Sequence, residues 1–329
     1  MFEPSSDVSL FFRRENGPPA AVRLVVTVPT FRRPQQLVET LESLRIQAPG
    51  LPFAVIVMEN DAEGGAGATA ARNFMEHHGL DGLVVIAHQR GNCHAYNAGW
   101  TAALAHYPGL EALAVIDDDE LATPGWLAGL LAAQAATGAD LVGGPQEPRF
   151  EAGRRPDLAR HPVFSPAYAT TGPVPILYSS GNVLIRRAVL DAMPRPFLDP
   201  LFNFIGGGDS DFYRRCKARG FRFAWSAEAA VVEAVPARRM QADWIRTRSL
   251  RNGAISAMLE HRAAPGAAGR LKTLAKSLAL LAASPWRGIA LWRRTGLAAA
   301  APYHLQVALG RLMAEAGIVG EQYRHPEKN

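Results

Sequence analysis

The stretch ALAVIDDDE (112–120) joins five apolar residues to four consecutive carboxylates. A short apolar run of this kind is typical of a strand buried inside a sheet. Apolar strand-like runs alternate with segments of helical spacing before it, at 22–28, 34–47, 53–58, from about Ala68, 83–87 and 95–106. This alternation predicts an α/β fold with a mostly parallel, Rossmann-like sheet and helices on both of its faces.

The carboxyl ends of the predicted strands carry polar residues. Ligands of parallel sheets bind beyond these ends, so we expect the functional site there. The ends are Pro29-Thr30, Glu59-Asn60-Asp61, 88–92 and 117–120.

The acidic run has two interpretations. Acidic residues could form a solvated loop that favours the start of the helix predicted near Pro124. Four adjacent carboxylates also repel one another, however, and their mutual charge raises their pKa values. A divalent cation removes this conflict, and hard carboxylate oxygens suit Mg²⁺ or Mn²⁺, especially when phosphates complete the shell. We therefore predict a metal and diphosphate site in this run.

The chain changes character after residue 140. Residues 145–175 are rich in Pro and Arg and suggest a long functional loop, whereas 176–185 are apolar again. A helix is predicted at 209–220 and a closing strand at 221–232. From 240 onward the chain is rich in Ala, Leu and Arg, which predicts helices with breaks at Pro265, Pro285 and Pro302.

The composition fits a folded protein with a core. Of the 329 residues 48% are hydrophobic and 20% charged, and the net charge is +5. The part from 236 to 329 holds 15 Lys and Arg against 5 Asp and Glu, so the front is acidic and the tail basic. Cys93 and Cys216 match no metal spacing and predict no disulfide framework, which indicates a reducing compartment. Residues 1–19 lack the features of a signal peptide, and no apolar stretch is long enough to span a bilayer.

An ordered set of motifs resembles the inverting family 2 glycosyltransferases with a GT-A fold, and within them the succinoglycan-type exopolysaccharide transferases of bacteria. The motifs are VVTVPTFRRPQQLVETLESL (25–44), VIVMENDAEGGA (55–66), GNCHAYNAG (91–99), AVIDDDELATPGWL (114–127), SSGNVLIRR (179–187), GGGDSDFYRRC (206–216) and EAVPARR (233–239). The resemblance implies an N-terminal segment (1–21), a catalytic domain (22–240) with a nucleotide-sugar half (22–120) and an acceptor half (121–240), and a basic helical region (241–329).

The resemblance also assigns the donor and metal residues. It implies that the nucleotide-sugar contacts are Pro29, Thr30, Arg32, Glu59, Asp61, Asn97, Asp117 and Asp118. It implies Asp117 and Asp119 as the Asp-x-Asp metal ligands, with Mg²⁺ or Mn²⁺ as the ion. Simpler roles are a plain strand end for Pro29-Thr30, a solvated charge for Arg32, and a cap or turn for Asn97.

An inverting transfer needs a base for the acceptor hydroxyl. Asp209 aligns with the base of the family, and Asp211 is the second candidate, although Asp209 could be only a helix cap. The acceptor side is implied to include Gly181, Asn182, Gly207, Gly208 and Trp126, with packing as the simpler role of Trp126.

Three positions depart from the family pattern. Tyr96 replaces an Arg that could neutralise phosphate charge, and Arg32 or Arg33 could compensate. Gly208 replaces a Glu, so an acceptor contact could be missing. Glu233 stands where many relatives have a metal-binding His, and it could bind the metal or pair with Arg238.

The basic tail suggests a membrane surface. Lys272 and Lys276 alternate with Leu271, Leu274, Leu278 and Leu281 over 269–283, which predicts an amphipathic helix on an anionic bilayer. The alternative is packing on the catalytic domain, and the arginines at 238, 239, 246, 248 and 251 could instead grip a diphosphate. We expect a cytoplasmic protein, peripheral on the inner face of the cytoplasmic membrane. Nucleic-acid binding is not expected, because aromatic residues do not interleave with the basic ones.

The sequence leaves two other function classes open. Residues 65–70 fit the G-x-G-x-x-A fingerprint of a dinucleotide-binding oxidoreductase, but the first glycine lies too far beyond its strand and no acid follows the third strand. A non-catalytic protein that binds a nucleotide sugar or scaffolds a membrane complex is the second. The main prediction is an inverting transfer from an NDP-sugar, with UDP favoured, to a glycan or lipid-linked saccharide in polysaccharide biosynthesis.

Overall fold

The computed structural model describes residues 7–47, 52–151, 155–321 and 324. They divide into two compact units, which are described separately: 1–146, 167–203 and 208–233 form the first, and 147–166, 204–207 and 234–329 the second.

A mixed sheet is the framework of the first unit. Its described strands have the order β1-β4-β3-β2-β5-β10-β7-β11-β9. Their bounds are β1 (Val8–Arg14), β2 (Leu24–Thr30), β3 (Ala54–Glu59), β4 (Gly82–Ala87), β5 (Ala112–Ile116), β7 (Leu141–Gly143), β9 (Gly172–Val174), β10 (Asn182–Arg186) and β11 (Phe223–Trp225). The strands β4, β3, β2 and β5 run parallel, as predicted. The strand β10 is antiparallel to both β5 and β7.

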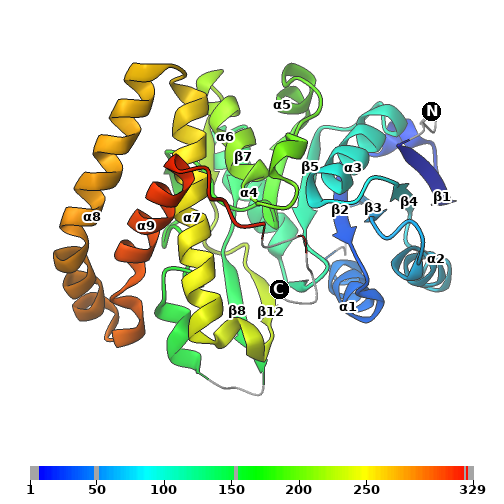
Figure 1. The fold of residues 1–329 in the computed structure, drawn as a ribbon. Helices are drawn as coiled ribbons and strands as arrows, with labels where there is room; N and C mark the ends of the chain where they lie inside the picture. The colour runs from blue at the N-terminus through cyan, green and yellow to red at the C-terminus, as the bar shows by residue number, and fades with distance from the viewer. Residues whose placement is uncertain (1–6, 48–51, 152–154, 322–323, 325–329) are drawn as a thin grey trace. The chain divides into compact units, whose positions relative to one another are not determined.

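Helices cover both faces of this sheet, which confirms the predicted α/β class (Figure 1). The helices α1 (Pro34–Arg45), α2 (Ala66–His78) and α4 (Trp126–Thr137) pack on one face, where Leu37, Met75 and Leu127 share a core with β2 and β3. The helix α3 (Asn92–His106) packs on the other face, where Gly99 lies against Met58. The short α5 (Arg187–Ala192) follows β10, and α6 (Gly208–Ala218) precedes β11.

The N-terminal strand was not expected. The strand β1 pairs antiparallel with β4 and so forms the edge of the sheet. Its sequence VSLFFRR mixes apolar and charged residues because it is an edge strand and only partly buried. Residues 1–6 of the predicted N-terminal segment lie outside the described part.

The predicted long loop at 145–175 is only partly a loop. It contains β8 (Gln146–Phe150), the 3₁₀ helix Pro156–Arg160 and β9. The predicted closing strand is likewise two strands, β11 and β12 (Val231–Val235), and β12 pairs antiparallel with β6 (Glu120–Ala122). Proline lowers strand propensity, but the pairing of β9 with β11 outweighs that preference at Pro173.

Helices dominate the second unit: α7 (Ala242–Ala263), α8 (Ala267–Thr295) and α9 (Tyr303–Glu315). Gly253 of α7 and Gly310 of α9 permit close packing, since an added Cβ at Gly310 would lie 1.9 Å from the Leu250 carbonyl oxygen. The buried Arg311 side chain of α9 donates hydrogen bonds to Ser256 and Glu260 of α7 and to Ser277 of α8. This one cation therefore links all three helices.

The predicted break at Pro285 is wrong, because α8 continues through it. Proline has no N–H to donate to the carbonyl four residues earlier, which belongs to Leu281. The hydroxyl of Ser284 donates to that carbonyl over 2.7 Å instead. No helix in the described part of the chain is long and apolar enough to cross a membrane.

Candidate active site

The acidic run turns sharply at the end of β5, and its side chains alternate in exposure. Asp118 and Glu120 are buried, whereas Asp117 and Asp119 are only half-buried. One backbone segment therefore places two carboxylates inward, where they hold the loop, and two at the accessible side. This alternation agrees with the spacing of an Asp-x-Asp motif.

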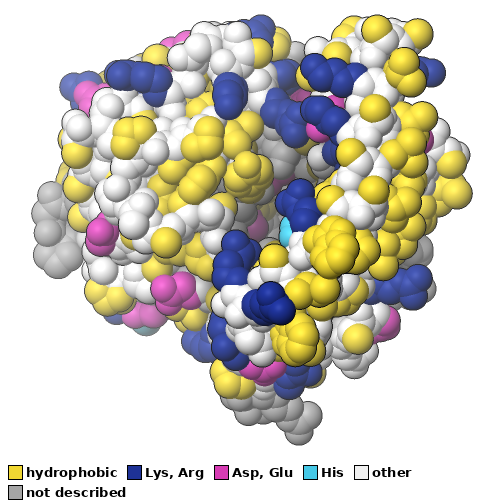
Figure 2. Space-filling view, turned by 90° about the vertical axis from the view of Figure 1, so that its left-hand side faces the viewer, with side chains coloured by type: hydrophobic (Ala, Val, Ile, Leu, Met, Phe, Trp, Pro, Cys, Tyr) yellow, Lys and Arg dark blue, Asp and Glu magenta, His cyan; other side chains and the backbone are white. Residues whose placement is uncertain are grey.

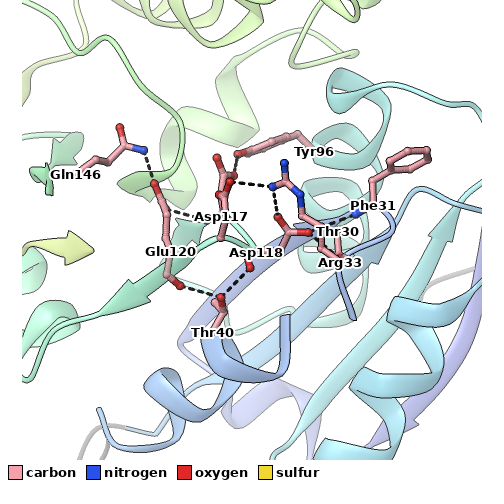
Figure 3. A network of polar contacts seen from close by, with 10 residues as sticks. Thr30, Phe31, Arg33, Thr40, Tyr96, Asp117, Asp118, Glu120 and Gln146 are labelled. Atoms are coloured by element: carbon pink, nitrogen blue, oxygen red, sulfur yellow. Dashed lines mark hydrogen bonds and ion pairs between the residues drawn. The ribbon is translucent and has the colours of Figure 1, made fainter. Parts of the chain in front are cut away.

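The inward carboxylates belong to a hydrogen-bond network (Figure 3). Asp118 accepts hydrogen bonds from the Thr30 hydroxyl at 2.9 Å and from Arg33 Nη1 at 3.0 Å. The Glu120 carboxylate accepts hydrogen bonds from the backbone N–H of Asp117, three residues earlier, at 2.9 Å and from Gln146 Nε2. Burial raises the pKa of Asp118 to about 6, and it raises the pKa of Glu120 well above its usual range.

A helix fixes the loop from below. The Thr40 hydroxyl of α1 lies 3.1 Å from the carbonyl oxygen of Asp118 and 2.7 Å from that of Glu120 (Figure 3). Thr40 was missed as a site residue. It is a polar residue on the buried helix face that carries Leu37, Leu41 and Leu44, and that irregularity is the signal by which it could have been found.

Asp117 and Asp119 have different partners. The Tyr96 hydroxyl of α3 donates to Asp117 Oδ1 at 2.5 Å, and Arg33 Nη1 lies 2.8 Å from Asp119 Oδ2. Burial raises the pKa of Asp117 to about 7, and the charges of Asp119, Asp118 and Glu233 add to this effect. Arg33 is thus the cation that the structure places among these acids, and Tyr96 contacts the acidic run in place of the expected Arg.

Glu233 joins the same cluster. It lies on β12 directly opposite Glu120 of β6, which brings its charge near Asp117. Several carboxylates that lie close together provide the oxygen ligands that a hard divalent cation prefers. Among the described residues, however, no three His, Cys, Asp or Glu side chains form a group that could hold a metal ion. The chemistry of the acids fits such an ion, and oxygens from a ligand would have to complete its shell.

The residues at the ends of β2 and β3 form a second group. Pro29 and Thr30 are buried at the end of β2. Glu59 is also buried, and its carboxylate accepts from the N–H groups of Asp61 and Ala68, each at 2.9 Å. Desolvation raises the pKa of Glu59. Its carboxylate therefore fixes the start of α2 in this conformation.

The exposed partner of this group is Arg32. Its Nε donates to Asp61 at 2.8 Å, and its guanidinium lies 4.9 Å from the centre of the Phe31 ring. Arg32 adopts φ 57°, a left-handed conformation that is uncommon for residues other than glycine. The turn after β2 thus directs Arg32 outward while Arg33 points into the acidic cluster.

Asn97 has a structural partner at each end of its amide. Its Nδ2 donates to the Leu198 carbonyl at 2.7 Å, and its Oδ1 accepts from the Leu198 N–H at 2.9 Å. The amide therefore holds the segment before α6 in this conformation.

The candidate bases lie in the first turn of α6. Asp209 is half-buried and accepts from the Ser210 N–H at 2.7 Å. Asp211 is buried and accepts from Arg215 Nε at 2.7 Å, so it is engaged within its own helix. Burial raises the pKa of Tyr213 in the same helix well above its usual range, and the negative charges of Asp209 and Asp117 add to this effect.

The glycines near α6 have a steric explanation. A Cβ on Gly208 would lie 2.8 Å from the Cys93 sulfur, so the Glu of the family pattern has no room here. A Cβ on Gly181 would lie 2.6 Å from Glu120 Oε1. Gly207 has φ 92° and belongs to the second unit.

The two cysteines are free, and burial raises the pKa of the Cys93 and Cys216 thiols to about 12.

Two expected acceptor residues lie in the core instead. Trp126 is 0% exposed, and its Nε1 donates to Asn182 Oδ1 at 2.8 Å. Asn182 is buried too, and its Nδ2 donates to the carbonyls of Pro145 and Ala229. In this conformation the polar atoms of both side chains are used to join β10 and α4, and acceptor contact by either one stays a prediction.

The chain is similar to known proteins. The family model described as glycosyl transferase family 2 matches residues 25–193. The succinoglycan biosynthesis protein ExoM of Rhizobium meliloti (strain 1021) is 32% identical over 248 residues, which cover 72% of this chain and 74% of that protein.

Solved structures share the fold. A mannosyltransferase of Pyrobaculum calidifontis, determined in complex with GDP-Man and Mn²⁺, aligns with a TM-score of 0.55 at 22% identity over 90% of this chain and 88% of that chain. TarS of S. aureus aligns with a TM-score of 0.50 at 14% identity, over 86% of this chain and 55% of that chain. The family match covers β2 to α5, including the acidic run, and with the curated relative it establishes that the chain is a glycosyltransferase that belongs to glycosyl transferase family 2.

Proposed function

We propose that this glycosyltransferase moves a sugar from an NDP-sugar, with UDP favoured, to a hydroxyl of a glycan or lipid-linked saccharide, with inversion at the anomeric carbon. The observation that carries the proposal is the alternation in the acidic run, which leaves Asp117 and Asp119 partly exposed while Asp118 and Glu120 are buried and hold the loop. The relatedness to a succinoglycan biosynthesis protein supports a role in bacterial exopolysaccharide synthesis.

The donor diphosphate is assigned to the accessible acids. Asp117, Asp119 and Glu233 do not form a complete metal-binding group by themselves in the described structure, so they would hold Mg²⁺ or Mn²⁺ only together with diphosphate oxygens. Such an ion supplies neutralisation of the charge that develops on the departing diphosphate. Arg33, now paired with Asp119, is well placed to contact phosphate when that pairing is relaxed. Asp118 supports this arrangement by fixing Thr30 and Arg33.

The nucleoside is assigned to the ends of β2 and β3. Arg32 and Asp61 lie at the surface of this edge, whereas Pro29, Thr30 and Glu59 shape it from below. Asn97 contributes by holding Leu198.

The transfer itself is a single in-line displacement. Asp209 accepts the proton of the acceptor hydroxyl as its oxygen bonds to the anomeric carbon, and the bond from that carbon to the diphosphate oxygen breaks. The nucleoside diphosphate leaves with the bonding electron pair. Asp209 is preferred to Asp211, because Asp211 is buried and paired with Arg215. Gly181 and Gly208 are assigned to the acceptor side as residues where a side chain would meet Glu120 and the Cys93 sulfur.

One substitution separates catalysis from mere binding. Asp209→Asn keeps the shape of the side chain but cannot take up the proton, so we expect transfer to fall by at least about 100-fold. Calorimetry should show unchanged affinity for UDP with Mn²⁺. The matched control is Asp191→Asn, which removes an exposed carboxylate on α5 and should retain full transfer. Full activity of Asp209→Asn would remove Asp209 as the base.

The donor is identified by a separate screen. UDP-, GDP- and dTDP-sugars are incubated with the protein and Mn²⁺, and slow hydrolysis is followed by release of the nucleotide. We expect UDP-sugars to be hydrolysed fastest, and a preference for another nucleotide would correct that choice. We also place the protein at the inner face of the cytoplasmic membrane as a peripheral protein, because its proposed acceptor includes lipid-linked saccharides.

A further inference from the structure

The helix α8 has its small residues inside and its large apolar residues outside. Its buried positions are Gly269, Thr273, Ser277, Ser284, Gly288, Leu291 and Thr295. Six of these seven side chains are small or polar, and only Leu291 is a large hydrophobe. The buried face therefore lacks the apolar stripe by which a surface helix usually joins a core.

The large hydrophobes of α8 face the solvent. The exposed fractions are 68% for Leu271, 50% for Leu278, 76% for Trp286, 41% for Ile289 and 50% for Trp292. Leu271 and Leu278 are seven residues apart and Ile289 follows eleven residues later, which are spacings of about two and three whole turns, and Trp286 and Trp292 lie three residues to either side of Ile289, so these side chains share one broad side of the helix. In the view onto the side of the molecule where α8 lies, hydrophobic side chains gather in a stripe with Lys and Arg beside it (Figure 2).

The charge on this helix has one sign. Its six charged residues are all basic, namely Arg270, Lys272, Lys276, Arg287, Arg293 and Arg294, and all six are exposed. Exposed apolar patches on monomeric proteins mark interaction surfaces. A partner that fits the exposed face of α8 must offer an apolar region to the hydrophobic stripe and negative charges to the basic side chains next to it.

An anionic bilayer meets both requirements. Its headgroups attract Lys and Arg, and its interface accommodates Trp side chains together with aliphatic ones. Because α8 is one continuous helix of 29 residues, the apolar stripe can lie flat along a surface over its whole length. The continuity through Pro285 matters here, since a break would separate Leu271 and Leu278 from the two tryptophans.

We propose that α8 docks this protein flat on an anionic lipid surface, with Leu271, Leu278, Trp286, Ile289 and Trp292 inserted at the interface and the basic side chains on the headgroups. This inference deepens the peripheral placement in the proposed function by naming the surface and the lipid charge. It needs no nucleotide sugar, so its test can fail while sugar transfer succeeds, and the reverse also holds.

The experiment measures binding of the full chain to vesicles. Phosphatidylcholine vesicles are compared with vesicles of an equimolar mixture of phosphatidylcholine and phosphatidylglycerol, and bound protein is quantified by co-sedimentation. We expect binding to the mixed vesicles only, weakened by salt. Trp286→Ser with Trp292→Ser should lower affinity by roughly tenfold or more, since both side chains bury apolar area on docking. The triple change Lys272→Gln, Arg293→Gln and Arg294→Gln should cost roughly fivefold per charge.

Control variants separate this surface from general stickiness. Ile46→Ser removes a hydrophobe that is 52% exposed on another part of the chain and should leave vesicle binding unchanged. Circular dichroism should confirm that all variants stay folded, because the substituted side chains are exposed.

Tryptophan fluorescence gives an independent measurement. Of the six tryptophans, Trp100, Trp126 and Trp225 are buried, Trp244 is half-buried, and Trp286 and Trp292 are exposed. Lipids brominated on their acyl chains should quench the wild-type protein and have little effect on the double Trp variant. Equal vesicle binding by wild type and the double Trp variant would overturn the proposal. So would a dimer in sedimentation that the double variant abolishes without any vesicle binding, because a second copy would then be the partner.

Discussion

The hydroxyl of Tyr96 lies 2.5 Å from Oδ1 of Asp117, and it joins α3 to the first acid after β5. The family pattern places an Arg at this position, and a phenol cannot offer a positive charge. It can, however, donate one hydrogen bond in a fixed direction, because Tyr96 is fully buried. The contact orients the carboxylate that we assign to the metal.

Tyr96→Phe tests this contact. Hydrogen bonds to charged groups contribute about 1.5–3 kcal/mol, so the free energy of unfolding should fall by about that amount. Transfer should weaken as well, because Asp117 is no longer oriented. Urea unfolding and a donor titration give the two values. Tyr107→Phe is the matched control, since the Tyr107 hydroxyl is buried and has no hydrogen-bond partner in the described part of the chain. Equal losses for the two variants would contradict the prediction.

Thr40→Val should impair transfer without touching any substrate. The hydroxyl of Thr40 holds the carbonyl oxygens of Asp118 and Glu120, and valine has the same shape but no donor. We expect the unfolding free energy to fall by about 1 kcal/mol, with a lower kcat. Thr40→Ser should restore most of the kcat, because serine keeps the hydroxyl. If serine behaves like valine, packing of the Thr40 methyl group and not the hydrogen bond is what matters.

His161 should make the second unit sensitive to acid. Its ring is fully buried, and burial lowers its pKa to about 4. In the unfolded chain the pKa returns to about 6.5, so the unfolded state takes up the proton first as the pH falls. Stability is therefore lost from about pH 6.5 downward. Between pH 7.5 and pH 5 the wild type should lose roughly 2 kcal/mol more than His161→Phe.

Urea unfolding at the two pH values measures this difference. His77→Gln changes an exposed histidine and should follow the wild type. A His161→Phe protein that loses as much stability as the wild type would show that other groups dominate the acid response.

Gly310→Ala should destabilise the helical unit. The added methyl group would lie 1.9 Å from the Leu250 carbonyl oxygen, and backbone on α7 cannot move aside cheaply. Overpacking of this kind typically costs about 1–3 kcal/mol, so thermal unfolding should occur at a clearly lower temperature. Gly320→Ala is the control in the same unit, because nothing lies within 4 Å of its added Cβ. Unchanged melting of Gly310→Ala would mean that α7 and α9 pack less closely.

The sequence predicted the parts of the fold that local patterns control. The strands β2, β3, β4 and β5 are apolar runs with polar ends, and a parallel sheet buried on both faces requires that pattern. Local patterns in the sequence did not predict contacts between residues that are far apart in the chain. The strand β1 depends on pairing with β4, and the passage of α8 through Pro285 depends on the Ser284 hydroxyl.

The site shows the same division. The resemblance to an Asp-x-Asp motif selected Asp117 and Asp119, and in the structure these two are the partly exposed members of the run. The sequence named Arg33 as one of two arginines that could compensate for Tyr96, but its pairing with Asp119 and the contact of Gln146 with Glu120 join distant chain segments, and no local pattern predicts these contacts. The exclusion of Glu at position 208 follows from the nearby Cys93 sulfur, a contact between distant residues.

The reversed polarity of α8 bears on how this chain can change over generations. Where the helix meets its neighbours, selection should act on side-chain size: Gly288 has the Ala301 carbonyl oxygen 2.5 Å from an added Cβ, so bulkier replacements should be purged. On the outward face hydropathy should be retained while residue identity drifts among Leu, Ile, Met and aromatic residues. In an alignment of related sequences, neighbouring positions of α8 would then be conserved in different ways. The buried positions would keep a small side-chain volume, and the exposed positions would keep their hydrophobicity.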